Sequence, residues 1–112
     1  MNSIKLERIN SAIKREISYV LANEVKDTNI NFVTVTAVKT TNDLSYCKVY
    51  VTVFKNELRD EALKALKNAK GFIRKSLASR VDIRHIPELE FVYDESLEYG
   101  KRIEDKIKEI NN

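Results

Sequence analysis

Hydrophobic and polar residues repeat along this chain with two different periods, and the changes of period mark the predicted elements. From about Ile4 to Val25 the apolar residues recur every three or four positions, which predicts a long amphipathic helix. Two segments rich in β-branched residues at alternate positions follow, Phe32–Lys39 and Tyr46–Phe54. The polar run TTNDLS between them predicts an antiparallel hairpin with a loop longer than two residues.

The second predicted strand has one apolar face and one mixed face. The apolar face carries Cys47, Val49, Val51 and Val53, and the mixed face carries Tyr46, Lys48, Tyr50 and Thr52. We expect the valine face to pack against helices and the tyrosine face to be the more solvated side.

The helical period returns after Asn56. One packed face holds Leu58, Ala62, Ala65, Leu66 and Ala69, and a second helix after Gly71 holds Ile73, Leu77 and Val81. Glycine costs about 1 kcal/mol relative to alanine inside a helix. The small-residue break Ala69-Lys70-Gly71 therefore predicts a kink or a close packing contact.

The chain's single proline, Pro87, ends any helical segment and leads into a third short strand, Leu89–Tyr93. Asp94 or Ser96 can cap a last helix, whose inward face holds Ile103, Ile107 and Ile110. The order predicts an α+β two-layer domain, in which helices cover one face of a three-stranded sheet. We find no repeat and no linker, so we expect residues 1–112 to form a single domain.

Positive charge is concentrated between Lys64 and His85. This segment has seven basic residues and one acid, whereas the whole chain has a net charge of only +3. The basic residues are Lys64, Lys67, Lys70, Arg74, Lys75, Arg80 and Arg84. Such segregation is typical of a surface that binds a polyanion, although a charge run can also be a solvated helix face.

Weaker basic candidates lie on the first predicted helix. Lys5, Arg8 and Arg15 share a face there, but Glu7 and Glu16 dilute their charge and can pair with them. Tyr46 and Tyr50 can stack on bases, although strand aromatics more often serve packing.

The remaining chemistry excludes several classes of protein. No segment is apolar for the roughly 20 residues of a membrane span, and no Cys/His cluster has zinc-ligand spacing. His85 has no nucleophile or carboxylate partner in a recognisable arrangement, and we interpret Asp43 as a turn residue. The one cysteine, Cys47, is expected to be a small buried hydrophobic residue in a reducing, cytoplasmic setting. We therefore expect no enzyme, no metal and no cofactor.

Several short strings of the chain together resemble the ribosome-binding factor A family, bacterial assembly factors of the small ribosomal subunit. The strings are, in chain order, Val25-Lys26-Asp27, Val33-Thr34-Val35-Thr36, Asp43-Leu44, Lys48-Val49-Tyr50-Val51, Ile73-Arg74, Pro87-Glu88-Leu89-Glu90-Phe91 and Asp94-Glu95-Ser96. Each string alone is unspecific, whereas their order and spacing are specific, and the resemblance covers Arg8 to about Ile110.

The resemblance implies a fold similar to the type II KH domain. In this family an Ala-x-Gly kink, matched here by Ala69 and Gly71, replaces the GXXG loop with which KH domains clamp nucleotides. It also implies binding to 16S rRNA of the immature 30S subunit, a role in its late maturation and rRNA processing, and release by a ribosome-associated GTPase. We expect a monomer. Some family members carry a basic tail, whereas the sequence here ends in EINN.

Two rival functions stay open at this point. The protein can be a protein-interaction module that docks through its exposed sheet face, with basic helices that serve only solubility. A small enzyme is the weaker rival, because the chain has two glycines, no phosphate-binding loop and no acid–base pair.

Overall fold

The structure, a computed structural model, describes residues 2–96. Its elements are α1 (Ser3–Asn23), a 3₁₀ turn (Thr28–Ile30), β1 (Val33–Thr40), β2 (Tyr46–Val53), a second 3₁₀ turn (Asn56–Leu58), α2 (Arg59–Ala78) and β3 (Glu88–Tyr93). The predicted last helix with Ile103, Ile107 and Ile110 lies outside the described residues.

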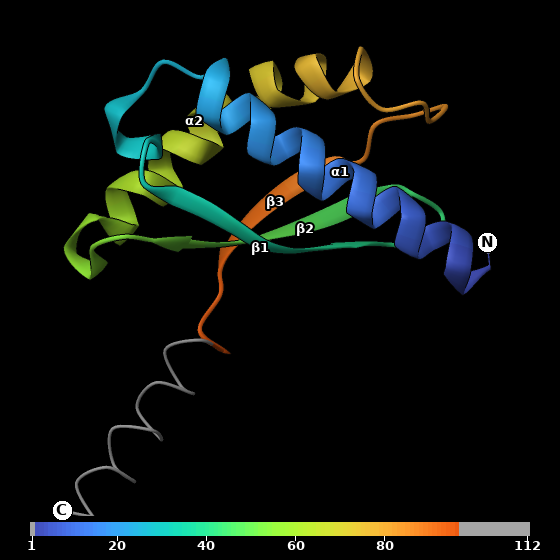
Figure 1. Ribbon diagram of the computed structural model, residues 1–112, viewed down its shortest axis with the longest axis horizontal. Coiled ribbons are helices and arrows are strands. Elements are labelled where there is room, and N and C mark those ends of the chain that lie inside the picture. Colours follow the sequence, from blue (N-terminus) through green and yellow to red (C-terminus); the bar gives the residue numbers. More distant parts are fainter. Residues whose placement is uncertain (1, 97–112) are drawn as a thin grey trace, which may run out of the picture.

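The three strands form one sheet in the order β1-β2-β3. β1 and β2 pair as the predicted antiparallel hairpin, with Val33 opposite Val53. β3 returns parallel to β2, with Tyr46 opposite Glu88, so α2 is the crossover between two parallel strands. Both helices lie on the same side of the sheet (Figure 1), α1 against β1 and α2 against β3. The predicted α+β two-layer architecture is confirmed.

The core lies between the valine face of the sheet and the two helices. Val49 and Val51 of the central strand are fully buried, as is Cys47, whereas Tyr46 on the opposite face is 64% exposed. The helices contribute to the same cluster the residues Ile13, Ile17, Val20, Leu66, Ile73 and Leu77. Each such side chain contributes about 1.5–3 kcal/mol by leaving water. The face opposite the helices, called the open face below, has no layer over it among residues 2–96.

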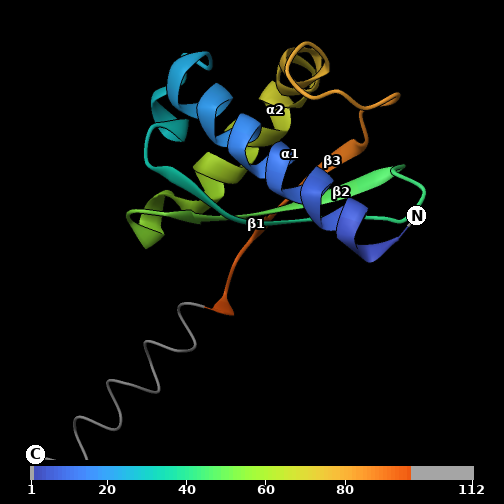
Figure 2. The same ribbon diagram turned by 45° about the vertical axis from the view of Figure 1, so that its right-hand side comes forward.

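The predicted division of the second helical segment into two helices was wrong. α2 is one helix from Arg59 to Ala78 and runs through Gly71. A Cβ atom at Gly71 would meet nothing within 4 Å, so close packing does not explain this glycine. The ribbon of α2 changes direction along its length in both views (Figures 1 and 2), and the kink at Ala69 and Gly71 stays a prediction. The helix ends well before Pro87, and Val81 lies in the following loop.

The hairpin carries a β-bulge and a tight loop. The register shifts between Val35 and Ala37, which leaves Thr36 as the extra residue of β1. In the loop, Asp43 Oδ1 accepts hydrogen bonds from the Thr41 hydroxyl at 2.8 Å and from the amide and hydroxyl of Ser45 at 3.1 and 2.7 Å. These bonds support the left-handed backbone of Leu44, whose φ is 61°. The interpretation of Asp43 as a turn residue is confirmed.

Candidate nucleic-acid interface

Three of the predicted basic residues surround one groove. Lys64, Lys67 and Lys70 line a cavity of about 400 Å³ between α2 and the outer edge of β3. Leu63 and Phe91 supply apolar lining, and Glu90 is the single acid among the lining residues. The spacing of three residues keeps the lysines on neighbouring faces of the helix. We call this cavity the lysine groove.

Arg74 binds to other parts of the protein, whereas a basic residue in a surface charge run is expected to face solvent or a polyanion. Its Nε donates to the carbonyl oxygen of Pro87 at 3.1 Å, and its Nη2 donates to that of Ile86 at 2.8 Å. Its Nη1 lies 3.3 Å from Glu88 Oε1, and only 30% of its side chain is exposed. The guanidinium therefore holds the segment that enters β3 against α2.

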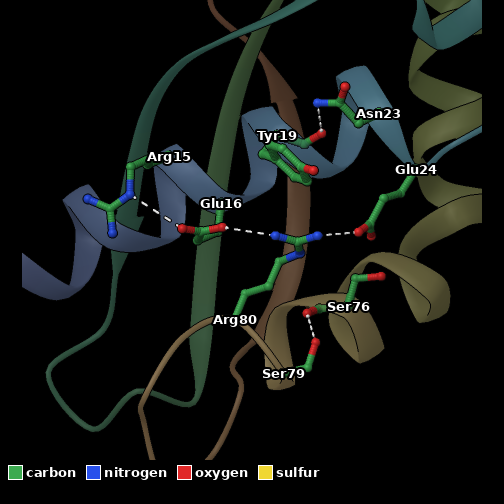
Figure 3. A network of polar contacts seen from close by, with 8 residues as sticks. All are labelled: Arg15, Glu16, Tyr19, Asn23, Glu24, Ser76, Ser79 and Arg80. Atoms are coloured by element: carbon green, nitrogen blue, oxygen red, sulfur yellow. Dashed lines mark hydrogen bonds and ion pairs between the residues drawn. The ribbon is translucent and has the colours of Figure 1, made fainter.

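Arg80 is also occupied within the protein (Figure 3). Its guanidinium is paired with Glu24 at the end of α1 and lies 3.6 Å from Glu16. It also stacks 4.3 Å from the ring centroid of Tyr19. The hydrogen bond between the Arg80 and Glu24 side chains lowers the pKa of Glu24 and raises the pKa of Arg80. This network joins the turn that follows α2 to α1.

The other basic residues predicted to bind a polyanion are exposed and lie on different elements of the fold. Lys75 lies on α2 and Arg84 in the loop before β3. Lys5, Arg8 and Arg15 lie along α1, where Arg15 pairs with Glu16 at 3.4 Å. Because α1 packs on β1 and α2 on β3, the structure does not bring the α1 residues to the lysine groove.

Two of the residues with other possible chemistry, Cys47 and Asp43, have structural roles. Cys47 is buried, as predicted, and burial raises the pKa of its thiol. The hydrogen bonds from Ser45 and Thr41 lower the pKa of Asp43 to about 2. His85 is exposed in the loop before β3, and Tyr50 is half-buried. Within residues 2–96 no group of three or more His, Cys, Asp or Glu side chains is placed to hold a metal ion. No helix in this range is long and apolar enough to cross a membrane.

Sequence reasoning missed part of this site. Glu90 and Phe91 line the groove from β3, and Leu63 lines it from α2. The alternation in LEFVY predicts that Glu90 and Phe91 point to opposite faces, but it does not show which helix lies beside them. The carbonyl partners of Arg74 also left no signal in the sequence.

The fold and the groove together define a small two-layer α+β domain with a cationic groove at a sheet edge. The chain belongs to the ribosome-binding factor A family, whose profile matches residues 5–107. It is 49% identical over 112 residues to the ribosome-binding factor A of Staphylococcus epidermidis, a match that covers 99% of this chain and 97% of that protein.

Two structural comparisons agree with this assignment. The crystal structure of ribosome-binding factor A from Thermus thermophilus aligns with a TM-score of 0.72 and 32% identity, over 79% of this chain and 93% of that one. A homology model of the T. thermophilus protein, fitted into a cryo-EM map of its complex with the 30S subunit, aligns with a TM-score of 0.62 and 30% identity. That alignment covers 85% of this chain and 97% of the fitted one.

Proposed function

We propose that this protein is a non-catalytic ribosome assembly factor that binds 16S rRNA of the immature 30S subunit and assists its late maturation and rRNA processing. Membership of the ribosome-binding factor A family supports this proposal, as does the complex of the T. thermophilus relative with the 30S subunit. The observation in this chain that carries the proposal is the lysine groove, where Lys64, Lys67 and Lys70 face one cavity.

The proposed interface consists mainly of phosphate contacts. α2 is continuous through Ala69-Lys70-Gly71, so no glycine loop is present there to clamp nucleotides as in a KH domain. In the KH-like arrangement that we propose, lysine side chains take over this task and contact phosphates rather than base edges. Lys75 and Arg84 are exposed and stay candidates for further phosphate contacts, whereas Arg74 and Arg80 hold elements of the fold in place.

The proposal also includes two properties that follow from the family resemblance. The protein acts as a monomer in the cytoplasm, and a ribosome-associated GTPase releases it when assembly is complete. Preferential affinity for the immature rRNA conformation would favour one folding route of the subunit, because a ligand shifts an equilibrium only by its differential affinity for the two states.

Sedimentation of the protein with immature and mature 30S subunits across a salt series tests the proposal. We expect preferential binding to the immature subunits. Replacing Lys64, Lys67 and Lys70 with glutamine should weaken this binding and reduce the salt slope by about 0.7–0.9 per lost phosphate contact. The matched control replaces the exposed residues Lys14, Lys48 and Lys55 with glutamine, which removes the same charge elsewhere.

The outcomes separate the candidate functions. Equal losses in the two triple variants would show a general effect of net charge and would contradict a groove-centred interface. Unchanged binding in the groove variant would favour the rival function, docking of a protein through the open face. This rival function is supported by the exposure of two aromatic residues on the open face, Tyr46 (64%) and Phe54 (76%).

A further inference from the structure

A second cavity continues the lysine groove toward the open face. It has a volume of about 440 Å³ and is lined by Tyr46, Lys70, Glu88, Leu89 and Glu90. Lys70 and Glu90 also line the lysine groove, so the two cavities adjoin at these residues. β3 is an edge strand with Leu89 buried toward the helices, so Glu88 and Glu90 lie on the open face. The two cavities therefore lead from α2 past β3 to Tyr46, and we call the second one the Tyr46 cavity.

Tyr46 presents an exposed ring on a firmly held backbone. The residue is 64% exposed. Its amide donates to the Thr41 hydroxyl oxygen at 3.1 Å, and its carbonyl oxygen accepts from the Thr41 amide at 2.9 Å. On the other side, the Glu88 amide donates to the carbonyl oxygen of Ser45 at 2.9 Å. Because the backbone is held from both sides, the ring loses little conformational freedom when a planar ligand stacks on it.

The two acids of the Tyr46 cavity differ in their partners. Glu88 Oε1 lies 3.3 Å from Arg74 Nη1, so the charge of Glu88 is balanced within the protein. Glu90 makes no ion pair and no side-chain hydrogen bond with another residue of the range 2–96. It lies diagonally across from Tyr46, whose direct partner is Glu88, and such diagonal neighbours are about 7–8 Å apart. The Glu90 carboxylate is therefore available to a ligand that stacks on the Tyr46 ring.

An aromatic ring, a lysine and an unpaired carboxylate together suit a nucleotide with an unpaired base. The base stacks on Tyr46, the ammonium group of Lys70 contacts its phosphate, and Glu90 accepts hydrogen bonds from the edge of the base. A carboxylate accepts hydrogen bonds only, so it repels phosphate and favours a base that carries donors. Guanine alone among the RNA bases has two adjacent donors on its Watson–Crick edge, N1–H and N2–H. This edge is accessible in single strands and not in a duplex.

We propose that Tyr46, Lys70 and Glu90 form a subsite for one unpaired guanine of a single-stranded RNA segment that continues from the lysine groove. This inference rests on the proposed function, because it requires RNA in the lysine groove. It adds a base preference to a surface whose lysines contact phosphates alone. It also assigns the exposed Tyr46 ring to RNA rather than to a protein partner at the open face.

Fluorescence anisotropy of labelled RNA strands with the full-length protein tests the subsite. The probes are a uridine strand of about ten nucleotides and the same strand with one central guanine or one central adenine. We expect the guanine strand to bind several-fold more tightly than the other two. Tyr46→Ala should weaken its binding by about 5- to 150-fold, because base stacking is lost, whereas Tyr46→Phe should retain most of the affinity. The control Phe54→Ala removes an exposed ring outside the Tyr46 cavity and should not change the affinity.

Glu90→Gln separates the subsite from general binding by basic residues. It should abolish the preference for the guanine strand, while the uridine strand binds at least as tightly as to the parent, because a negative charge has left the groove. A preference that survives Glu90→Gln would overturn the inference, and so would parental affinity in Tyr46→Ala. Binding of immature 30S subunits but of none of the strands would overturn the subsite and leave the proposed function standing. A protein that binds neither the subunits nor the strands would refute both.

Discussion

Arg74 provides the sharpest test of how the structure changes the interpretation of the basic segment. Arg74 and Lys75 are neighbours in the sequence and carry the same charge, so a sequence pattern treats them alike. In the structure, Arg74 donates to the carbonyl oxygens of Ile86 and Pro87 and pairs with Glu88, whereas Lys75 is exposed. We predict that Arg74→Ala destabilises the fold and that Lys75→Ala does not.

The expected magnitude follows from these contacts. A hydrogen bond to a charged group contributes about 1.5–3 kcal/mol, and the two carbonyl bonds lie in a site where the arginine side chain is 30% exposed. Taking the low end for each bond and allowing partial rehydration of the carbonyl groups leaves about 2–3 kcal/mol for Arg74→Ala. The ion pair with Glu88 adds at most about 1 kcal/mol, because Glu88 is 55% exposed. Arg74→Lys keeps the charge but lacks the planar fork, so we expect it to recover less than half of the loss.

Urea unfolding followed by circular dichroism measures these differences as shifts of the midpoint at constant slope. Lys75→Ala, the matched control, should stay within about 0.5 kcal/mol of the parent. If Arg74→Ala and Lys75→Ala unfold at the same urea concentration, the carbonyl contacts do not hold the segment that enters β3. The assignment of Arg74 as a structural residue would then be wrong, and Arg74 would again be as good a candidate for the proposed rRNA contact as Lys75.

Three further predictions concern the rest of the fold. Arg80→Ala should lower the thermal midpoint because it breaks the network with Glu24, whereas Arg84→Ala at an exposed loop position should leave it unchanged. Gly71→Ala should raise the free energy of unfolding by about 0.5–1 kcal/mol, because alanine favours the helix and its Cβ has room; a loss of stability would show that the backbone there needs glycine. Asp43→Ala should be less stable than the parent at pH 7, with a difference that fades as pH falls from 3.8 through about 2, because a carboxyl with a lowered folded-state pKa stabilises only while it is ionised. Urea midpoints measured between pH 2 and 7 check this, and a difference independent of pH would contradict it.

The strands and the first helix were predictable because each carries its own period. The valine face of β2 is buried along its whole length, as alternation alone indicated. The parallel pairing of β3 was not predictable, because the pattern of a short strand shows which face is apolar but not which strand lies beside it. The continuity of α2 through Gly71 has an energetic reason. A cost of about 1 kcal/mol for one glycine is smaller than the gain from burying Leu66 and Ile73 on either side of it.

The candidate site was predictable in part, for a related reason. Charge density pointed to the segment that contains α2, and in the structure Lys64, Lys67 and Lys70 of this segment line one groove. The roles of Arg74 and Arg80 depend on acceptors far away in the sequence, at Pro87 and at Glu24. Composition therefore identifies a basic segment. Only the tertiary structure distinguishes the basic side chains that pair with other groups of the protein from those that face solvent.

The parallel return of β3 has a consequence for how this chain folds. The β1–β2 hairpin joins neighbouring segments and can form early, but β3 pairs with β2 only after the whole of α2 has been placed. Until then one edge of β2 has unpaired backbone groups beside the apolar residues Val49 and Val51. Such an edge is a template for pairing with another chain. Pairing between β2 and β3 is slow, because the chain between them loses conformational entropy before the contacts of the strand pair can compensate for that loss. The protein is therefore most prone to aggregation in the period before β3 docks.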